Sequence, residues 1–572
     1  MAKKTDIYEI WDRYQKSKDY MLKKQLLTRT EKNWLMYLGD QWKAVKDHEG
    51  MEDLPSMNFI KPTVKYKVSS IASTKVVAMY SDLNGERTVA TGEMVLDPMN
   101  QTVVPEMVTT NEIVTKMNAI FDISWEKGKL QKQGKKMLRH AAVQGDSYLY
   151  WGEGGDTRKT PQVIHNTQMH LGDENITNIQ EQPWLIIEER LDVQVVKELA
   201  RAAGIEEQKI KELYPDGSKD ENLLNKEEVK GKITSLLYME KDPKTGIVSF
   251  GRCTKEIMYE PLHAIEQKKV TGESVGIGLT KYPIVSLIWE EKPNDARGVS
   301  EVEQLIPNQL ELNKMLARRA ISAKMTAFPR TAYDESSLAN PEDLGKVGAA
   351  LKLNGANAQS ISSMIAYLSP QSMSPDAQQL CDELMSNSRT LAGASDAQLG
   401  NIDLSRVSGT AAQTVRDQQQ LPLNEQQETY QDFVENIALL WCELWKVYYP
   451  EGIEWDGIKL TAEEILSVEP NVRVDIAEDT SLSKMAAQQE ITNLFMNNKI
   501  TMAEFAEAYP DHSTLPKDVL KKIVQTRQAL QQQGMPLLND DGTPINDMVG
   551  GGVNPGGMSG GSYQNLQSML AQ

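Results

Sequence analysis

The sequence predicts an α+β fold that is predominantly helical. Its 572 residues exceed what one hydrophobic core usually supports, so we expect more than one packed region. Across much of the chain the apolar residues recur at steps of three or four, as amphipathic helices require. Between residues 146 and 290 short apolar or alternating runs are separated by turn residues, which predicts strands. The first half is therefore mixed, and the second half largely helical.

In the first half, helical periodicity predicts helices over residues 6–38, 58–79 and 111–143. Gly39 provides a stop for the first of them. Strands are predicted at 147–151, 184–188, 233–239, 247–252 and 284–289. A short helix over 192–203, ending at Gly204, interrupts the strands. The Lys-, Glu- and Asp-rich stretch that follows it, up to about residue 230, is expected to be an exposed insertion.

The second half opens with a long helix over residues 298–328, in which Ser300 and Glu303 match a capping box and Pro307 is a potential kink. After a compact, turn-rich interval, with a strand-like run at 349–353 and an apolar run at 361–368, a helix is predicted at 376–391. A polar, glycine-containing loop then precedes a helix at 410–449, whose Trp441 and Trp445 are expected in the core. Capping boxes at Thr461 and Thr501 introduce short helices, and the chain from 534 onward is expected to be disordered.

Composition restricts the classes of function. Against 80 Asp and Glu stand 62 Lys and Arg, a formal net charge of −18, so the surface as a whole repels phosphate backbones. The three cysteines are far apart, which provides neither a disulfide framework nor a cysteine-rich zinc site and favours a reducing compartment. The charged start does not predict a signal peptide, and apolar runs stop at about eight residues, too short to span a bilayer.

Sequence motifs for catalysis are missing. There is no phosphate-binding loop, and Gly276-Ile277-Gly278 lacks the third glycine and the following helix of a dinucleotide fingerprint. His165 and His170 are five residues apart, a spacing that does not place them on one helical face as zinc ligands. No Gly-x-Ser-x-Gly elbow occurs. We therefore expect no catalytic residue, no cofactor and no metal.

A basic run lies in the third predicted helix. It consists of Lys127, Lys129, Lys132, Lys135, Lys136 and Arg139. It is either a solvated helix face on an acidic protein or a contact surface for nucleic acid or an acidic partner.

Several segments, and above all their order, resemble the portal proteins of tailed bacteriophages. Residues 29–42 (RTEKNWLMYLGDQW) followed by 55–62 (PSMNFIKP) are similar to the opening of that family. Residues 141–149 (AAVQGDSYL) resemble its helix-to-strand step, with Gly145 at the centre. Residues 298–305 (GVSEVEQL) with Asn313 resemble its long-helix start, and 393–411 its loop before a very long helix. The resemblance covers roughly residues 10 to 530.

This resemblance implies a portal fold that assembles into a closed ring with a central channel. Carried over, its parts are the wing (1–297), the first stem helix (298–328), the clip (329–372), the second stem helix (373–392), the tunnel loop (393–409), the long wing helix and following segment (410–480), the crown (481–533) and a disordered Gly-rich tail (534–572). Such rings commonly contain twelve subunits.

The resemblance also implies site residues. The tunnel loop facing DNA would contain Gly393, Ser395, Asp396, Gly400, Asn401, Asp403, Arg406, Ser408 and Gly409. Stem charges facing the channel or a neighbouring subunit would be Glu311, Arg318, Arg319 and Lys324. The clip, which would dock a terminase or an adaptor, contains Arg330, Asp334, Glu335, Glu342, Asp343, Lys346 and Lys352.

The implied function is non-enzymatic: a virion channel at one capsid vertex that conducts double-stranded DNA without sequence specificity. Its partners would be copies of itself, the major capsid and scaffolding proteins, the terminase large subunit and a head–tail adaptor, with no membrane involved. The protein would be made in the bacterial cytoplasm. An acidic wall suits such a channel, because each phosphate contact would add affinity that holds DNA back. The alternatives are a metal-dependent DNA-processing phage enzyme and a helical adaptor or scaffold without a channel.

Charges in the first predicted stem helix are separated along its length. Glu301, Glu303 and Glu311 come early, and Arg318, Arg319 and Lys324 come late. Repeated around a ring, they would form stacked acidic and basic bands, of which the basic bands could hold DNA loosely. The equally open interpretation is that they pair between neighbouring subunits.

Overall fold

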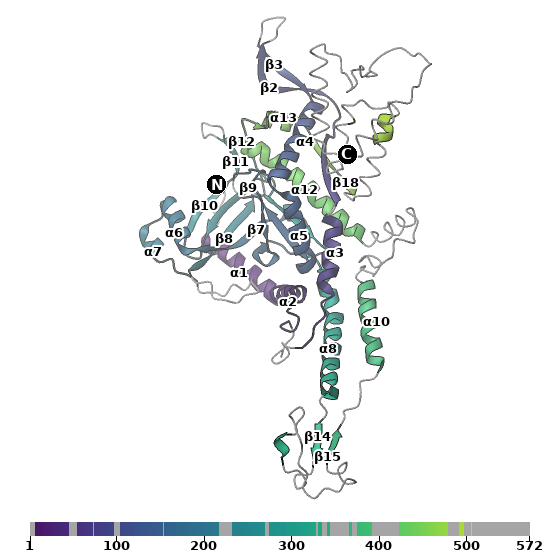
Figure 1. Ribbon diagram of the computed structural model, residues 1–572. Helices are drawn as coiled ribbons and strands as arrows, with labels where there is room; N and C mark the ends of the chain where they lie inside the picture. The colour runs from purple at the N-terminus through teal and green to yellow at the C-terminus, as the bar shows by residue number, and fades with distance from the viewer. Residues whose placement is uncertain are drawn as a thin grey trace, which may run out of the picture. The chain divides into compact units, whose positions relative to one another are not determined.

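The computed structural model describes residues 6–44, 54–72, 74–96, 103–152, 154–216, 231–268, 274–327, 330–333, 340–343, 365–368, 375–391, 423–478, 491–496 and 505. The chain divides into two units, Met1–Ala477 and Glu478–Gln572. In the second unit the described residues 491–496 are helical, and the rings of Phe495 and Phe505 lie 4.7 Å apart. The first unit mixes helices and strands and is shown in Figure 1.

Three helices open the first unit: α1 (Ile7–Lys23), α2 (Leu26–Leu38) and α3 (Ile60–Ala72). The single helix expected over 6–38 is therefore wrong, because Gln25 adopts a left-handed conformation (φ 56°) that breaks it. Gly39 ends α2 with φ 113°, as expected. The helix expected to reach residue 79 ends at Ala72. The Thr- and Val-containing segment β1 (Thr74–Asp82) instead pairs with β18 (Pro470–Glu478).

A hairpin of β2 (Thr88–Leu96) and β3 (Val103–Thr109) leads into α4 (Thr110–Lys127) and α5 (Leu130–Gln144). One helix was expected over 111–143, and this is also wrong. Lys129 has a left-handed backbone (φ 55°) directly after Gly128, so the chain turns between the two helices. At Gly145 (φ 101°) the chain passes from α5 into β4, which confirms the expected helix-to-strand step.

Two antiparallel sheets follow. The three-stranded sheet has the order β13-β4-β5, with β4 (Asp146–Tyr150), β5 (Gln162–Ile164) and β13 (Ile284–Ile288). The five-stranded sheet has the order β10-β9-β8-β7-β6. Its strands are β6 (Met169–Leu171), β7 (Trp184–Asp192), β8 (Lys232–Lys241), β9 (Val248–Cys253) and β10 (Met258–Ala264). The expected strands at 147–151, 184–188, 233–239, 247–252 and 284–289 are confirmed. The periodicity argument missed β5, β6 and β10, which are short or alternate irregularly.

Smaller elements complete this region. They are the turns η1 (Asn166–Gln168) and η2 (Ile179–Glu181), the helices α6 (Val193–Ala202) and α7 (Glu207–Lys211), and the hairpin of β11 (Glu266–Lys268) and β12 (Ser274–Gly278). The short helix expected at 192–203 is confirmed by α6. The expected insertion continues to residue 230, and residues 217–230 lie outside the described residues.

The long helix α8 (Glu301–Ala327) confirms the helix expected from Gly298 onward, and it continues through Pro307. Beyond it β14 (Arg330–Tyr333) pairs antiparallel with β15 (Ile365–Leu368), and η3 (Pro341–Asp343) lies between them in the chain. The chain then returns in α10 (Pro375–Leu391), which contacts α8 and runs beside it in Figure 1. The strand expected at 349–353 lies outside the described residues.

The core is built around α12 (Asn424–Tyr448). Its Trp441 and Trp445 are fully buried, which confirms the expected core role, and Trp441 contacts Trp151 and Phe121. The first unit ends with the hairpin of β16 (Ile453–Trp455) and β17 (Ile458–Leu460), then α13 (Ala462–Ser467), before β18. Thr461 and Glu464 form the expected capping box. The box at Thr501, the start of the helix expected at 410 and the tail lie outside the described residues.

A buried polar cluster joins α1 to the five-stranded sheet. Tyr14 donates to Glu188 at 2.9 Å, and His170 lies 3.1 Å from Ser17 and 3.7 Å from Glu188. Burial alone would raise the pKa of Glu188, but the contact with His170 and the nearby Lys18 outweigh it and lower that pKa to about 2. Because a buried carboxylate is stable only when hydrogen-bonded, this cluster holds α1 in place.

Two partly buried histidines lie together where α2 and α5 meet. The ring of His140 packs against Trp34 at 5.3 Å and against His165 at 5.8 Å. Burial lowers the pKa of His140 to about 3, with His165, Lys136 and Arg139 adding to the effect, and burial lowers the pKa of His165 to about 4. Both rings are therefore neutral in the folded protein at pH 7.

This arrangement predicts that acid weakens the fold. Unfolded histidine takes up a proton near pH 6.5, whereas the folded rings do not until about pH 3 to 4, so stability present above pH 6.5 is lost as the pH falls. Between pH 7.5 and 5.5 we expect a loss of about 1.4 kcal/mol per histidine, roughly 3 kcal/mol together, measured by urea unfolding. His140→Phe should remove about half of this loss. If His140→Phe leaves the loss of stability between pH 7.5 and 5.5 unchanged, the assignment of this loss to the two histidines is wrong.

Candidate functional site

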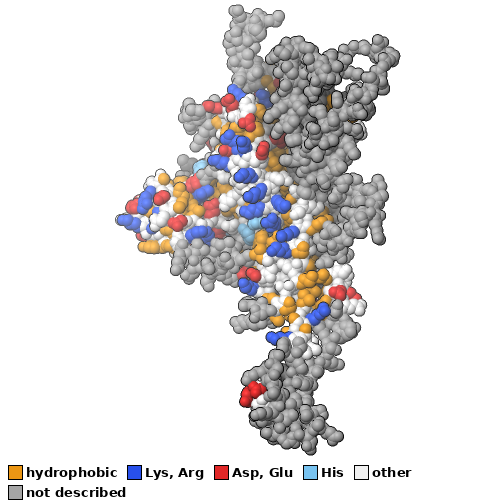
Figure 2. All heavy atoms as spheres, viewed as in Figure 1, with side chains coloured by type: hydrophobic (Ala, Val, Ile, Leu, Met, Phe, Trp, Pro, Cys, Tyr) orange, Lys and Arg blue, Asp and Glu red, His pale blue; other side chains and the backbone are white. Residues whose placement is uncertain are grey.

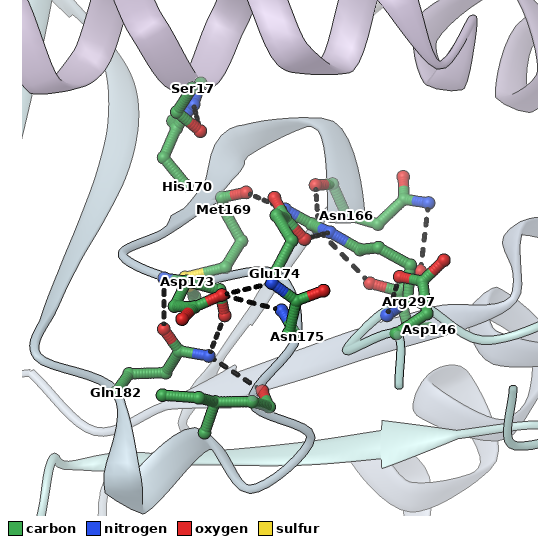
Figure 3. A network of polar contacts seen from close by, with 12 residues as sticks. Ser17, Asp146, Asn166, Met169, His170, Asp173, Glu174, Asn175, Gln182 and Arg297 are labelled. Carbon is green, nitrogen blue, oxygen red and sulfur yellow. Dashed lines mark hydrogen bonds and ion pairs between the residues drawn. The ribbon is translucent and has the colours of Figure 1, made fainter. Parts of the chain in front are cut away.

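Buried polar contacts surround the start of α8. We call the residues that make them the α8 anchor: Arg297, Glu301, Gln309, Asn313 and their partners. Arg297 lies just before the helix and is 5% exposed. Its guanidinium donates to Glu174 Oε2 at 3.0 Å and to the backbone oxygens of Asn166 at 3.0 Å and Met169 at 2.7 Å. It also pairs with Asp146 at 3.3 Å. Figure 3 shows these groups converging on the guanidinium.

Charge compensation is nearly complete around Arg297. Burial alone would lower its pKa, but Glu174, Tyr148 and Asp146 outweigh burial and keep that pKa well above its usual range. Burial raises the pKa of Asp146, while Arg297 and the hydrogen bonds from Tyr148 and Asn166 act in the opposite direction. An ion pair at this depth is stable only with both partners present. The cluster therefore fixes β4, β6 and the start of α8 as one unit.

Two glycines allow the backbone before α8 to cross the end of α5. A Cβ on Gly145 would lie 2.3 Å from Gly298 O, and a Cβ on Gly298 would lie 2.3 Å from Gly145 O. Gly145 also has φ 101°, which side chains rarely adopt, and its carbonyl accepts from Trp289 N at 2.9 Å. No other residue fits either position without backbone movement.

Glu301, the first residue of α8, forms a second buried pair. Lys67 of α3 donates to it at 2.8 Å, and the indole of Trp289 donates to its other oxygen at 3.2 Å. Ser300 accepts from Val302 N at 3.0 Å and donates to Val143 O at 2.7 Å. Ser300 therefore caps the helix, but the expected capping box with Glu303 is not found among the contacts of these described residues, since Ser300 accepts from Val302 N and Glu303 pairs with Arg29 at 3.7 Å. These contacts tie α8 to α2, α3 and α5.

Two amides extend the anchor about two to three turns along α8. Gln309 accepts from Phe59 N at 3.0 Å and donates to Met57 O at 2.7 Å. Asn313 accepts from Met57 N at 3.1 Å and donates to Gln41. Both amides are fully buried. They satisfy backbone groups of the segment before α3 that would otherwise be buried without partners.

The segments that carry the family resemblance meet at this anchor. Gln41 comes from 29–42, Phe59 from 55–62, Gly145 from 141–149, and Ser300 and Asn313 from the α8 region. The resemblance was drawn from their order in the chain, and the structure brings them into contact. Residues 393–411, the remaining segment, lie outside the described residues.

The distal half of α8 is exposed. From Arg318 onward the side chains that the structure describes are exposed, apart from the partly buried Ser322, and they include Ile321 at 45%. Of the expected stem charges, Arg318, Arg319 and Lys324 lie here. Glu311 precedes them and pairs with Lys314 at 3.7 Å and with Arg318 at 3.8 Å within the helix. Arg319 and Lys324 form no ion pair within the described part of the chain. Such exposed pairs each contribute about 0–1 kcal/mol, so they do not define the helix.

The other expected site residues are placed only in part. Arg330 begins β14, and Glu342 and Asp343 lie in η3, where Asn340 donates to Asp343 at 2.8 Å. Asp334, Glu335, Lys346 and Lys352 lie outside the described residues. So do all the expected tunnel-loop residues, from Gly393 to Gly409. The arrangement of the clip and tunnel residues therefore stays a prediction.

The sequence analysis missed Arg297, Asp146, Glu174 and Lys67 as a group. Arg297 lies in an Asn-Asp-Ala-Arg-Gly stretch that predicts an exposed turn. Asp146 directly follows Gly145, where an acidic residue is common at a turn. Their partners are distant in the chain, so no spacing rule would have identified the cluster.

No protein-family model matches the chain, and no curated protein sequence matches it at a significant level. Among the described residues, no three or more His, Cys, Asp or Glu side chains are grouped as metal ligands. Within that same part of the chain, helices with enough length and apolar character to cross a bilayer are absent.

Arg297→Ala should destabilise the first unit by about 3–5 kcal/mol, because it leaves Asp146 and Glu174 buried without their cation. Urea unfolding followed by tryptophan fluorescence measures this loss. Arg318→Ala, which removes an exposed cation from the same region, should change stability by about 0.5 kcal/mol or less. A loss below about 1 kcal/mol for Arg297→Ala would show that the cluster does not hold the fold together.

Gly145→Ala should destabilise the protein more than an alanine substitution at a glycine with a similar φ. Gly154 also has a positive φ (91°), but no atom lies within 4 Å of where its Cβ would be. Gly154→Ala therefore measures backbone strain alone, about 1–2 kcal/mol. Gly145→Ala adds the clash with Gly298, about 1–3 kcal/mol more. Equal losses of stability in the two variants, compared by thermal unfolding, would rule out the close crossing.

Proposed function

We propose that this chain is a portal protein of a tailed bacteriophage, a subunit of the ring-shaped channel at one capsid vertex through which double-stranded DNA is packaged and ejected. The observation that carries the proposal is the course of α8. It begins in a buried anchor, extends beyond the core, leads into the β14–β15 pair and returns as α10. This matches the order of wing, stem, clip and stem that the family resemblance implies.

The distal half of α8 supports assembly into a ring. Most helical stability in proteins comes from packing of an apolar face, and an isolated pair of helices provides little of it. Ile321 on α8 and Leu380 on α10 are 45% and 44% exposed although the two helices contact each other. Neighbouring copies would cover these side chains. The helix pair would then be a stem packed between two others.

The charge of the chain supports a conducting role. A net charge of −18 makes the protein repel the phosphate backbone overall, so DNA passing through a ring would not adhere to its wall. Arg319 and Lys324 would add weak basic positions in the stem. No motif for ATP hydrolysis occurs in the sequence, so a separate terminase would drive packaging. The capsid, scaffolding and adaptor proteins would be its other partners.

Purified full-length chain should form closed rings of about a dozen subunits with a central hole. Negative-stain electron microscopy shows the closure, and light scattering after gel filtration gives the mass. Monomers that cleave DNA with magnesium would instead establish a DNA-processing enzyme. Small or open oligomers would indicate an adaptor or scaffold without a channel.

A matched pair of variants connects ring formation to the stem. Ile321→Asp should prevent closure, because it places a carboxylate where the proposed neighbour packs. Leu22→Asp, at a 51% exposed position on α1, should leave the rings intact. If the Ile321→Asp variant still forms closed rings, this part of the stem is not in the assembly interface.

A further inference from the structure

The exposed face of α5 carries a row of cations, which we call the basic stripe: Lys129, Lys132, Lys136 and Arg139. All four are exposed, and no acidic residue occurs between Lys127 and Gln144. None of them forms an ion pair within the described residues. Lys135 lies beside the row. Figure 2 shows a group of Lys and Arg side chains over this region.

The N-terminal half of α12 carries the opposite charge, which we call the acidic stripe: Glu425, Glu428, Asp432 and Glu435. The first three are exposed and Glu435 is partly buried. No cation occurs from Asn424 to Asn436, and none of the four carboxylates forms an ion pair in the part of the chain that the structure describes. Burial and the charge of Asp432 raise the pKa of Glu435, which indicates that the stripe repels itself.

The two stripes have the same spacing. Successive charges are three, four and three residues apart in each, so both rows occupy one helical face and extend about 15 Å. Because this pattern reads the same in both directions, the rows can match whether the two helices run parallel or antiparallel. Like charges three and four residues apart destabilise a helix. Each stripe is therefore unfavourable on its own and would be stabilised by the other.

The stripes lie on opposite sides of the molecule's α5–α12 contact. At this contact the Tyr430 side chain of α12 reaches Gly134 of α5, since a Cβ on Gly134 would lie 2.5 Å from the Tyr430 hydroxyl. Gly134 follows Lys129 by five residues, and Tyr430 follows Glu425 by five. At about 100° per residue, each stripe is centred roughly 180° from this contact. The stripes therefore point away from each other and cannot pair within one chain.

We propose that the basic stripe of one copy of this chain docks against the acidic stripe of a second copy. Such a contact joins two different faces of identical chains, and repeated contacts of this kind produce a ring when the rotation closes. The inference rests on the proposed ring and names the surfaces that would form it. The contact is a network of exposed ion pairs, so added salt should weaken it.

A second copy of the chain accounts for both stripes, whereas DNA accounts for the basic stripe alone. A phosphate backbone would account for the basic stripe, but it would leave the matched acidic stripe without a role. It would also have to approach a chain of net charge −18. A second copy satisfies both stripes at once.

Charge reversal of each stripe tests the contact. In the full-length chain, Lys132→Glu with Lys136→Glu should raise the protein concentration needed for ring assembly about tenfold or more, because carboxylates would then face carboxylates. Glu428→Lys with Asp432→Lys should do the same. The matched control is Lys209→Glu with Lys211→Glu, an equal charge change on exposed positions of α7, which should assemble as the wild type does. Light scattering and negative-stain microscopy read out assembly, and circular dichroism verifies folding.

Rescue makes the test specific. A chain with both stripes reversed should form rings again, because each basic stripe then meets an acidic one. An equimolar mixture of the two singly reversed chains should co-assemble, since the reversed stripe of one chain then meets the reversed stripe of the other, and the two unchanged stripes also pair. If the wild type forms rings and single reversal leaves them unchanged, or if the doubly reversed chain stays unassembled, the stripe contact is wrong while the portal proposal stands. Intact rings that lose only DNA binding would assign the basic stripe to DNA. A wild type that remains monomeric at every protein and salt concentration would overturn both proposals.

Discussion

The ion-pair cluster of Arg297 is the constraint on which the first unit depends. A buried guanidinium is tolerable only when its hydrogen bonds are satisfied and its charge is balanced. Here the partners come from β4, η1, β6 and the loop that holds Glu174, so these elements and the start of α8 stabilise one another. The orientation of the long helix is therefore set by the sheets. The Gly145–Gly298 crossing and the Lys67–Glu301 pair also fix the start of α8, against the end of α5 and against α3.

Much of the fold was predictable because periodicity reports burial. The apolar face of α12, with Trp441 and Trp445, and the buried strands β7 and β8 follow from spacing alone. The helix predictions were wrong where a single residue changes the direction of the chain and its side chain gives no sign of this. Gln25 and Lys129 adopt left-handed conformations that their residue types do not favour, so two single helices were expected where four exist. β1 was taken for helix because its partner, β18, is almost 400 residues away.

The α8 anchor was not among the site residues that the sequence predicts, although Ser300 and Asn313, which belong to segments of the family resemblance, lie in it. The charges that balance Arg297 were not predictable, because a buried ion pair depends on distances between residues that are far apart in sequence. The tunnel-loop and most clip residues remain predictions from the resemblance, since they lie outside the described residues.

The two halves of α8 differ in how far the rest of the chain satisfies their side chains. The anchor satisfies the proximal half completely, with buried amides, a capping serine and paired charges. The distal half contacts α10, and both helices keep apolar side chains exposed. α5 and α12 repeat this division, with packed inner faces and outward rows of charge of opposite sign that form no ion pair among the described residues. A monomer leaves both the apolar residues and the charges unsatisfied, whereas a closed ring of copies would satisfy them together, and this is why the proposed stem and the proposed stripe contact belong to one assembly.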